Sequence, residues 1–392
     1  MTLSKPHILI SAFTFPPANN GVANAAYIHA KIMQELGCNV QVLTGGDKVS
    51  REMRDDLSIV RFPIFGKGHL FSPHRGTTKQ LHLFLSERRW DIIFMHCWQV
   101  WSTNCLLDFF ANKSRDEKLV LVSHGMSTDS SFHPFPLNLI RRILWLPYRH
   151  LVVPKYLSLI TELIVLWDHC DNDRFFDHTL ASQKDIPVSV IPNVARYNRR
   201  ETKRPSLRFT DEQLAGGFLL SVGNYSNEKN EFFVLDAYRQ SRMTDIPLIF
   251  VGHQHNYYLT KLDKLARKWG LQNVQFCTGL VQQELDWLYK HALVFLYGSK
   301  TECQPIVILD CLASETPYLS TDVGCVKCFP GATIVTSIKE MAAELRSLLE
   351  NPNRRDRLAR EGLDLYNKEF CFSSVKKKWG LCLSQLLPHF HQ

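Results

Sequence analysis

The sequence lacks the features that mark membrane-spanning, secreted and several nucleotide-binding proteins. The one long span without Asp, Glu, Lys or Arg, residues 6–30, contains three prolines and three asparagines, so no transmembrane helix is expected. The apolar run HILISAF near the start is shorter than a secretory h-region and has no cleavage-site pattern, so no signal peptide is expected. Neither a GxGxxG fingerprint nor a P-loop occurs, which argues against a dehydrogenase and an NTPase.

Cysteines are present, but not in a disulfide or zinc pattern. The 11 cysteines are odd in number and mostly lie inside apolar runs, which is typical of the reduced packing residues of a cytoplasmic protein. Cys325 and Cys328 form the only close CxxC, and no second pair follows at zinc spacing. HQH at 253–255 follows an apolar run and is expected to line a cleft rather than to bind metal. No metal site is therefore expected.

Length and charge bound the class of protein. At 392 residues the chain is longer than one hydrophobic core usually serves, and 45% hydrophobic with 21% charged residues is ordinary for a soluble protein. Two domains of nearly equal size are the default expectation. A net charge of +8 and a pI near 8.9 suggest an anionic partner, which leaves a nucleotide, a membrane surface and nucleic acid open.

Short apolar runs alternate with helical patterns along the chain. HILIS, the loop FTFPPANNG, the amphipathic stretch VANAAYIHAKIMQEL and VQVLT predict a strand, loop, helix and strand. The second half restarts with FLLSVG, PLIFVG, VQFCTG, LVFLYG and PYLSTDVG. The basic stretch from Arg196 to Arg208 between the halves is nearly devoid of apolar residues. The pattern predicts an α/β protein with two parallel, doubly wound domains, at 1–195 and 215–371, joined by a linker at 196–214.

Polar and glycine residues gather where the predicted strands end. In doubly wound sheets, ligands bind outside the carboxyl ends of the strands, where loops lead into helix N-termini. In the segment TECQPIVILD, a helix starting at Pro305 would place Glu302 in the loop before it and Asp310 on its second turn. Two carboxylates beside a helix N-terminus suit a ligand that carries both hydroxyls and phosphates. The other strand-end residues are Asn20, Gly21, His96, His124, Gly223, Asn224, Gly252 and Gly279.

The order of these segments resembles a known family. SVGNYSNEKN, PLIFVGHQ, NVQFCTGLVQQELDWLY and VFLYGSKTECQPIVILDCLASETPYLSTDVG are similar to the C-terminal half of retaining GT-B glycosyltransferases of the large family 4 type. PPANNG and SHG at 123–125 resemble landmarks of that family's N-terminal half. The resemblance implies the GT-B fold, with two Rossmann-like domains facing a central cleft, and a C-terminal helix at 372–392 that returns to the N-terminal domain.

The resemblance also implies roles for individual residues. Lys229 would contact the donor diphosphate, where an ammonium stabilises the charge of the leaving group. Glu302 would contact the transferred sugar, and Asp310 the ribose hydroxyls. His124 would approach the sugar from the N-terminal domain, and Gly21 would admit the donor close to the backbone beside the first helix. The remaining residues expected at the donor are Gly223, Asn224, Gly279, Leu280, Cys303, Gln304, Pro305 and Ile306.

Two residues depart from the family pattern. Asn224 stands where the family usually has an arginine, and Asp310 stands where it usually has a glutamate. Because of these departures, a second hypothesis stays open, namely a glycosyltransferase-like binding or scaffold subunit that has lost turnover. A sugar-nucleotide epimerase is a third hypothesis. The resemblance otherwise implies transfer from a nucleotide sugar with retention, no cofactor, no required divalent metal and no protein nucleophile. DND at 171–173 resembles the DxD metal motif of the other glycosyltransferase fold, and is given little weight.

One N-terminal segment suggests a membrane surface. From Ser130 to Thr161 the chain has no acidic residue, and the part from 137 to 160 mixes four basic residues with aromatic and aliphatic ones. This composition suits a helix on an anionic bilayer, and it is equally consistent with core packing. The expectation is a cytoplasmic protein that this segment can bring to the inner face of the membrane, with a lipid-linked or cell-surface glycan precursor as acceptor. Nucleic acid is not expected, because no recognition module accompanies the basic residues. The donor sugar, the base, the linkage formed and the oligomeric state stay open.

Overall fold

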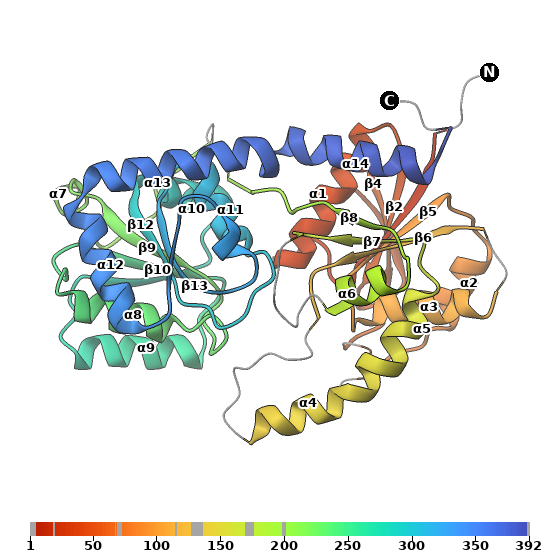
Figure 1. Ribbon diagram of the computed structural model, residues 1–392, viewed down its shortest axis with the longest axis horizontal. Coiled ribbons are helices and arrows are strands. Elements are labelled where there is room, and N and C mark those ends of the chain that lie inside the picture. Colours follow the sequence, from red (N-terminus) through yellow and green to blue (C-terminus); the bar gives the residue numbers. More distant parts are fainter. Residues whose placement is uncertain are drawn as a thin grey trace. The chain divides into compact units, whose positions relative to one another are not determined.

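The protein divides into two compact α/β units (Figure 1). The computed structural model describes residues 5–18, 20–66, 68, 73–113, 116–126, 136–168, 176–197 and 201–389. One unit comprises residues 1–193 and 375–392, and the other comprises residues 194–374. The motif DND at 171–173 lies outside the described residues.

The N-terminal unit contains an eight-stranded sheet in the order β3-β4-β2-β1-β5-β6-β7-β8. All neighbouring strands are parallel except β3, which pairs antiparallel with β4 at the edge. The strands are β1 (His7–Ser11), β2 (Asn39–Gly45), β3 (Ser50–Arg54), β4 (Leu57–Phe62), β5 (Ile92–His96), β6 (Lys118–Ser123), β7 (Glu162–Val165) and β8 (Val188–Val190). Strands β1 and β5 are almost entirely buried, as expected of a parallel sheet with helices on both faces.

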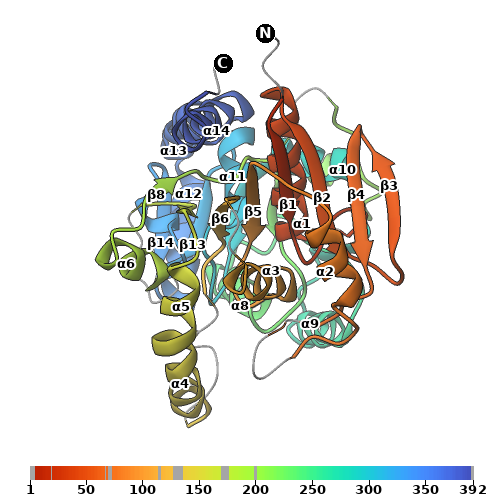
Figure 2. The same ribbon diagram turned by 90° about the vertical axis from the view of Figure 1, so that its right-hand side faces the viewer.

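Helices cover both faces of this sheet (Figure 2). The helices are α1 (Gly21–Glu35), α2 (Lys79–Ser86), α3 (Trp101–Ala111), α4 (Leu137–Pro147), the π-helical turn η1 (Tyr148–Val152), α5 (Val153–Leu157), α6 (Phe176–Gln183) and α14 (Phe372–Leu386). The Asn20 side chain caps α1 by accepting from the Ala23 backbone N–H at 3.0 Å. Residues of α14 from Val375 belong to this unit, and Trp379 of α14 is buried against His29 of α1.

The C-terminal unit contains a six-stranded parallel sheet in the order β11-β10-β9-β12-β13-β14. Its strands are β9 (Phe218–Val222), β10 (Leu248–Gly252), β11 (Val274–Thr278), β12 (Ala292–Tyr297), β13 (Tyr318–Thr321) and β14 (Ala332–Val335). Its helices are α7 (Asp211–Leu214), α8 (Glu231–Ser241), α9 (Tyr257–Lys268), α10 (Gln282–His291), α11 (Ile306–Ser314), the 3₁₀ turn η3 (Val326–Cys328), α12 (Ile338–Glu350), α13 (Pro352–Leu365) and the π-helical turn η4 (Tyr366–Phe370). Helices α8, α9 and α12 lie on one face of this sheet, and α10, α11 and α13 on the other (Figure 1).

Candidate functional site

The strand order of the C-terminal unit fixes where a ligand can bind. Numbered along the chain from β9, the order is 3-2-1-4-5-6, which is the doubly wound Rossmann order. The chain leaves β9 and β12 toward opposite faces of the sheet, and doubly wound sheets bind ligands in the crevice at such a switch point. The loop after β9 carries Lys229, and the loop after β12 carries Glu302.

Glu302 is the centre of a polar cluster beyond the carboxyl ends of these two strands. Its Oε1 pairs with the Lys229 ammonium and accepts a hydrogen bond from the Tyr297 hydroxyl. The Ser299 hydroxyl donates to the same oxygen at 3.0 Å, and the Lys229 Nζ lies 3.4 Å from the Tyr297 oxygen. Burial, together with the Glu302 charge, raises the pKa of Tyr297 well above its usual value, so this hydroxyl keeps its proton. The structure therefore brings together Lys229 and Glu302, which were expected at the donor.

Backbone and side-chain contacts hold the two loops against each other. The Asn230 amide donates to the Gly298 carbonyl at 3.1 Å, and the Lys300 N–H donates to the Glu228 carbonyl at 2.8 Å. A Cβ at Gly298 would lie 3.0 Å from the Asn230 carbonyl oxygen, so a larger residue there would press on the loop that carries Lys229. Lys229 and Glu302 are thus positioned by a packed pair of loops.

The other expected donor residues lie after the ends of strands of the same sheet. Gly223 and Asn224 follow β9 directly, and the Lys229 side chain lies beside Gly223. Gly279, with a φ of 71°, and Leu280 follow β11. Cys303, Gln304 and Pro305 are buried ahead of α11, which begins at Ile306 with Pro305 as its N-cap residue, one residue later than expected.

Asp310, which was expected at the ribose, makes its contacts with the start of the linker. Its carboxylate is fully buried in α11 and accepts hydrogen bonds from the backbone N–H groups of Arg196 at 2.6 Å and Tyr197 at 3.1 Å. The Arg196 guanidinium adds an ion pair at 3.0 Å. The shorter aspartate therefore fastens the start of the linker to α11, and its oxygens are already occupied.

Glu231 is a residue of this site that the sequence did not indicate. This first residue of α8 is 3% exposed, and its Oε1 has no hydrogen-bond partner in the described part of the chain. Its Oε2 accepts from the Ser226 N–H at 3.4 Å, within the loop that carries Lys229. Burial raises the pKa of Glu231 to about 7, and the backbone N–H groups and Lys229 oppose that rise.

In the N-terminal unit the expected residues also lie at the strand ends. Gly21 is the first residue of α1, after β1, and His124 directly follows β6. His124 Nε2 lies 3.0 Å from Nδ1 of His96, the last residue of β5. His29 on α1 continues this contact, since its Nδ1 lies 3.0 Å from His96 Nε2.

Helix α4 and the turn η1 expose an unusually apolar surface. Trp145 and Tyr148 are buried in the core of the N-terminal unit, whereas the aliphatic side chains around them are exposed. Helix α4 extends away from the sheet of its own unit (Figures 1 and 2). The exposed aliphatic residues, here called the α4 face, are Leu137, Leu139, Ile140, Ile143, Leu144, Leu146 and Leu151. Among the described residues, no helix is long and apolar enough to span a bilayer.

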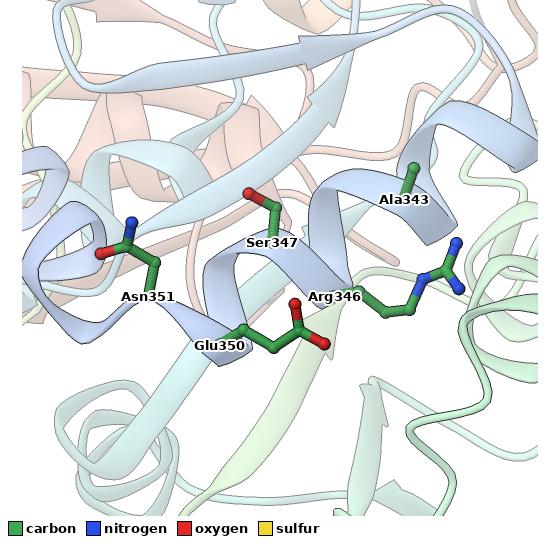
Figure 3. Close-up of a pocket in the computed structure, with 5 residues that line it drawn as sticks. All are labelled: Ala343, Arg346, Ser347, Glu350 and Asn351. Carbon is green, nitrogen blue, oxygen red and sulfur yellow. The ribbon is translucent and has the colours of Figure 1, made fainter.

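Two further features stand apart from the crevice. Within the described ranges, no group of three or more His, Cys, Asp or Glu side chains is arranged to hold a metal ion, and Cys325 and Cys328 are linked through the backbone of a tight turn. A polar pocket on α12 includes none of the expected site residues (Figure 3). Its lining residues are Ala343, Arg346, Ser347, Glu350 and Asn351.

Comparison with known proteins agrees with this geometry. Residues 200–364, which contain both loops of the crevice, match the family model described as Glycosyl transferases group 1. The structure of Anabaena Alr3699/HepE in complex with UDP and glucose matches with a TM-score of 0.68 at 16% identity, over 97% of this chain and 100% of that one. The expected GT-B fold is therefore confirmed.

Two curated proteins match parts of the chain. The uncharacterized glycosyltransferase MJ1059 of Methanocaldococcus jannaschii is 22% identical over 175 residues, which are 43% of this chain and 41% of that protein. The alpha-monoglucosyldiacylglycerol synthase of Streptococcus pneumoniae is 24% identical over 320 residues, which are 78% of this chain and 69% of that protein.

Proposed function

We propose that the protein is a glycosyltransferase that takes a sugar from a nucleotide sugar. The observation that carries the proposal is the Lys229 and Glu302 cluster at the crevice between β9 and β12, inside the domain that matches the family model. A nucleotide-binding crevice at this point of a doubly wound sheet agrees with the general behaviour of the fold. The similarity to the structure of Anabaena Alr3699/HepE, which is a complex with UDP and glucose, supports a nucleotide sugar as the ligand.

The cluster offers the groups that glycosyl transfer requires. When the bond to the sugar breaks, negative charge grows on the departing diphosphate, and the Lys229 ammonium is placed to stabilise it. Glu302 accepts from Lys229, Tyr297 and Ser299 through Oε1, so these contacts orient the carboxylate for the hydroxyls of the transferred sugar.

We assign retention of configuration from the resemblance of the segment between Glu302 and Asp310 to that of retaining enzymes. In the mechanism that this resemblance implies, a diphosphate oxygen takes the proton of the acceptor hydroxyl as that hydroxyl attacks the sugar. No cofactor, divalent metal or protein nucleophile is assigned to this step. Lys229 then remains paired with the nucleoside diphosphate until it leaves.

A thermal-shift screen against UDP, GDP, ADP and their sugars tests the donor assignment. A ligand at 100 times its dissociation constant stabilises the folded protein by about 2.7 kcal/mol. We expect one nucleotide series to raise the melting temperature of the wild-type protein, and the rise to shrink in Lys229→Ala. If none of the nucleotides shifts the wild-type protein, the crevice does not bind a donor.

The acceptor is proposed to be lipid-linked, with the protein peripheral on a cytoplasmic membrane surface. The α4 face exposes Ile143 by 56% and Leu151 by 70%, in a segment whose sequence contains basic residues and no acidic ones. Apolar burial in the interface and attraction to anionic lipid act together on such a helix. The similarity to a synthase whose name specifies a glucosylated diacylglycerol supports a lipid acceptor.

Vesicle sedimentation tests the membrane part of the proposal. Replacing Ile140, Ile143 and Leu144 by Ser removes three side chains that are each about half exposed, so the core should tolerate the change. Burying the exposed part of each contributes about 1 kcal/mol, and the triple variant should bind anionic vesicles about 100-fold less tightly. Leu381→Ser, at an exposed position of α14 in the same unit, is the matched control.

The aliphatic variant is preferable to an arginine variant, because the Arg149 guanidinium lies 3.9 Å from the centre of the Phe176 ring and its loss would also disturb packing. Undiminished vesicle binding by the triple variant would exclude the α4 face as the docking surface. If the wild-type protein ignores anionic vesicles at low salt, a soluble acceptor replaces the lipid-linked one.

A binding or scaffold subunit without turnover is the second candidate. The observation that favours it is Asp310, whose carboxylate accepts hydrogen bonds from the linker residues Arg196 and Tyr197. Release of nucleoside diphosphate from a sugar donor by the purified protein separates the two candidates.

A further inference from the structure

Three histidines form a continuous hydrogen-bonded chain inside the N-terminal unit. His29 Nδ1 lies 3.0 Å from His96 Nε2, and His96 Nδ1 lies 3.0 Å from His124 Nε2. The three rings come from α1, the end of β5 and the residue after β6. The strand order places β1 between β2 and β5, so these elements meet where the order of this sheet reverses.

Aromatic side chains pack against His29, the inner end of the row of three histidines. The His29 ring stacks on Trp379 of α14, with centroids 3.8 Å apart and planes 14° apart, and meets Phe94 edge-on at 4.7 Å. His29 Nε2 is buried and has no hydrogen-bond partner in the described part of the chain. At the outer end, His124 is only partly buried, and no described residue bonds to its Nδ1.

All three imidazoles are neutral at physiological pH. Burial lowers the pKa of His29 to about 3 and that of His124 to about 4, and burial beside two other imidazoles places the pKa of His96 well below its usual value. A neutral imidazole carries one N–H and one bare nitrogen, so each ring is a donor at one end and an acceptor at the other.

This geometry allows only two arrangements of the three protons. Each N···N contact needs one proton, so a proton on His29 Nδ1 requires His96 to carry its proton on Nδ1 as well, and His124 then follows. The alternative places all three protons on Nε2, which leaves the buried His29 Nε2–H without an acceptor. Orphaned buried N–H groups are rarer and more costly than bare acceptors, so the first arrangement is favoured.

We propose that His29 and His96 are positioning residues that hold His124 as its Nδ1–H tautomer, so that His124 presents a hydrogen-bond donor at the strand end toward an oxygen of a bound sugar. The sugar contact rests on the proposed function, whereas the tautomer of His124 does not. His29 and His96 touch no ligand in this account, and they act only through the proton positions along the chain.

The experiment is a long-range ¹H–¹⁵N spectrum of the full-length protein labelled with ¹⁵N-histidine, which distinguishes the two neutral tautomers of each ring. The chain has 16 histidines, and the His124 signals are identified by their loss in His124→Gln. We expect the His124 proton on Nδ1. A His124 proton on Nε2 in the wild-type protein overturns the proposal.

A matched pair of His29 variants tests whether His29 sets the tautomer of His124. In His29→Asn the amide still donates toward His96 Nε2, so His124 should keep its Nδ1 proton. In His29→Asp, at alkaline pH, the carboxylate only accepts, which should move the proton of His124 to Nε2. Turnover should then fall about tenfold, as expected for the loss of one hydrogen bond to the substrate.

A folded His29→Asp variant whose His124 proton stays on Nδ1 overturns the coupling. If the His124 tautomer responds as expected but the protein releases no nucleoside diphosphate from any donor, the coupling between the three histidines is supported. The same result contradicts the proposed function. The two failures are therefore distinguishable.

Discussion

Asp310→Asn separates a structural from a ligand-binding role for this residue. The aspartate is fully buried, it accepts two backbone N–H groups, and its ion pair with Arg196 leaves the arginine side chain 19% exposed. Removing one partner of a buried ion pair costs about 3–5 kcal/mol, and the partial exposure of Arg196 favours the lower end of that range. The new amide N–H₂ would also face the donors that the carboxylate now satisfies.

Urea unfolding monitored by tryptophan fluorescence provides the assay. With a slope of about 3 kcal/mol/M, a loss of about 3 kcal/mol lowers the midpoint by about 1 M. Asp263→Asn is the control, because it removes the same charge from an exposed pair with Arg267, which contributes at most about 0.5 kcal/mol. An unchanged midpoint in Asp310→Asn, together with weaker donor binding, would refute the structural role and restore Asp310 as a ribose ligand.

Two further changes test the crevice. In calorimetry, Lys229→Ala should weaken binding of a nucleoside diphosphate about 10- to 100-fold and leave binding of the bare nucleoside nearly unchanged. The reason is that only the diphosphate loses a charge-assisted contact. Equal losses for both ligands would exclude a phosphate role for Lys229. Glu231→Gln should remove a pH dependence of stability. Because the pKa of the Glu231 carboxyl is raised to about 7, the folded state keeps a proton that the unfolded state has already released. The stability of the wild-type protein should therefore fall by up to about 3 kcal/mol as pH rises from about 4.5 to about 7. The same pH dependence in the glutamine variant would assign it to other groups.

The sequence predicted most of the parallel sheet framework because buried parallel strands are short continuous apolar runs. HILIS corresponds to β1 at His7–Ser11, and FLLSVG contains β9 at Phe218–Val222. Strand β3, with the sequence SREMR, was not predicted. It lies at the edge of the sheet with four of its five residues exposed, so it has no apolar pattern to detect, and its place depends on pairing with β4.

The sequence predicted those site residues whose position follows from the order of the strands along the chain. Lys229 and Glu302 each follow a strand, and the Rossmann order brings those two strands together. The role of Asp310 depends on a linker residue 114 positions away, which sequence spacing does not reveal. His29 likewise looks like one residue of an amphipathic helix, and only the packing of α1 against β5 and α14 joins it to His96 and Trp379.

Glu302 and Lys229 are proposed to form the donor site of a working glycosyltransferase. The most direct measurement is chromatographic detection of nucleoside diphosphate released from a panel of UDP-, GDP- and ADP-sugars by the wild-type protein and by Glu302→Gln. We expect release from one donor series by the wild-type protein, and at least 100-fold slower release by a folded Glu302→Gln variant, on the order of the loss when one charged contact to the transition state is removed. Release at the wild-type rate by the variant would remove Glu302 from the site, and no release from any donor by the wild-type protein would contradict the claim itself.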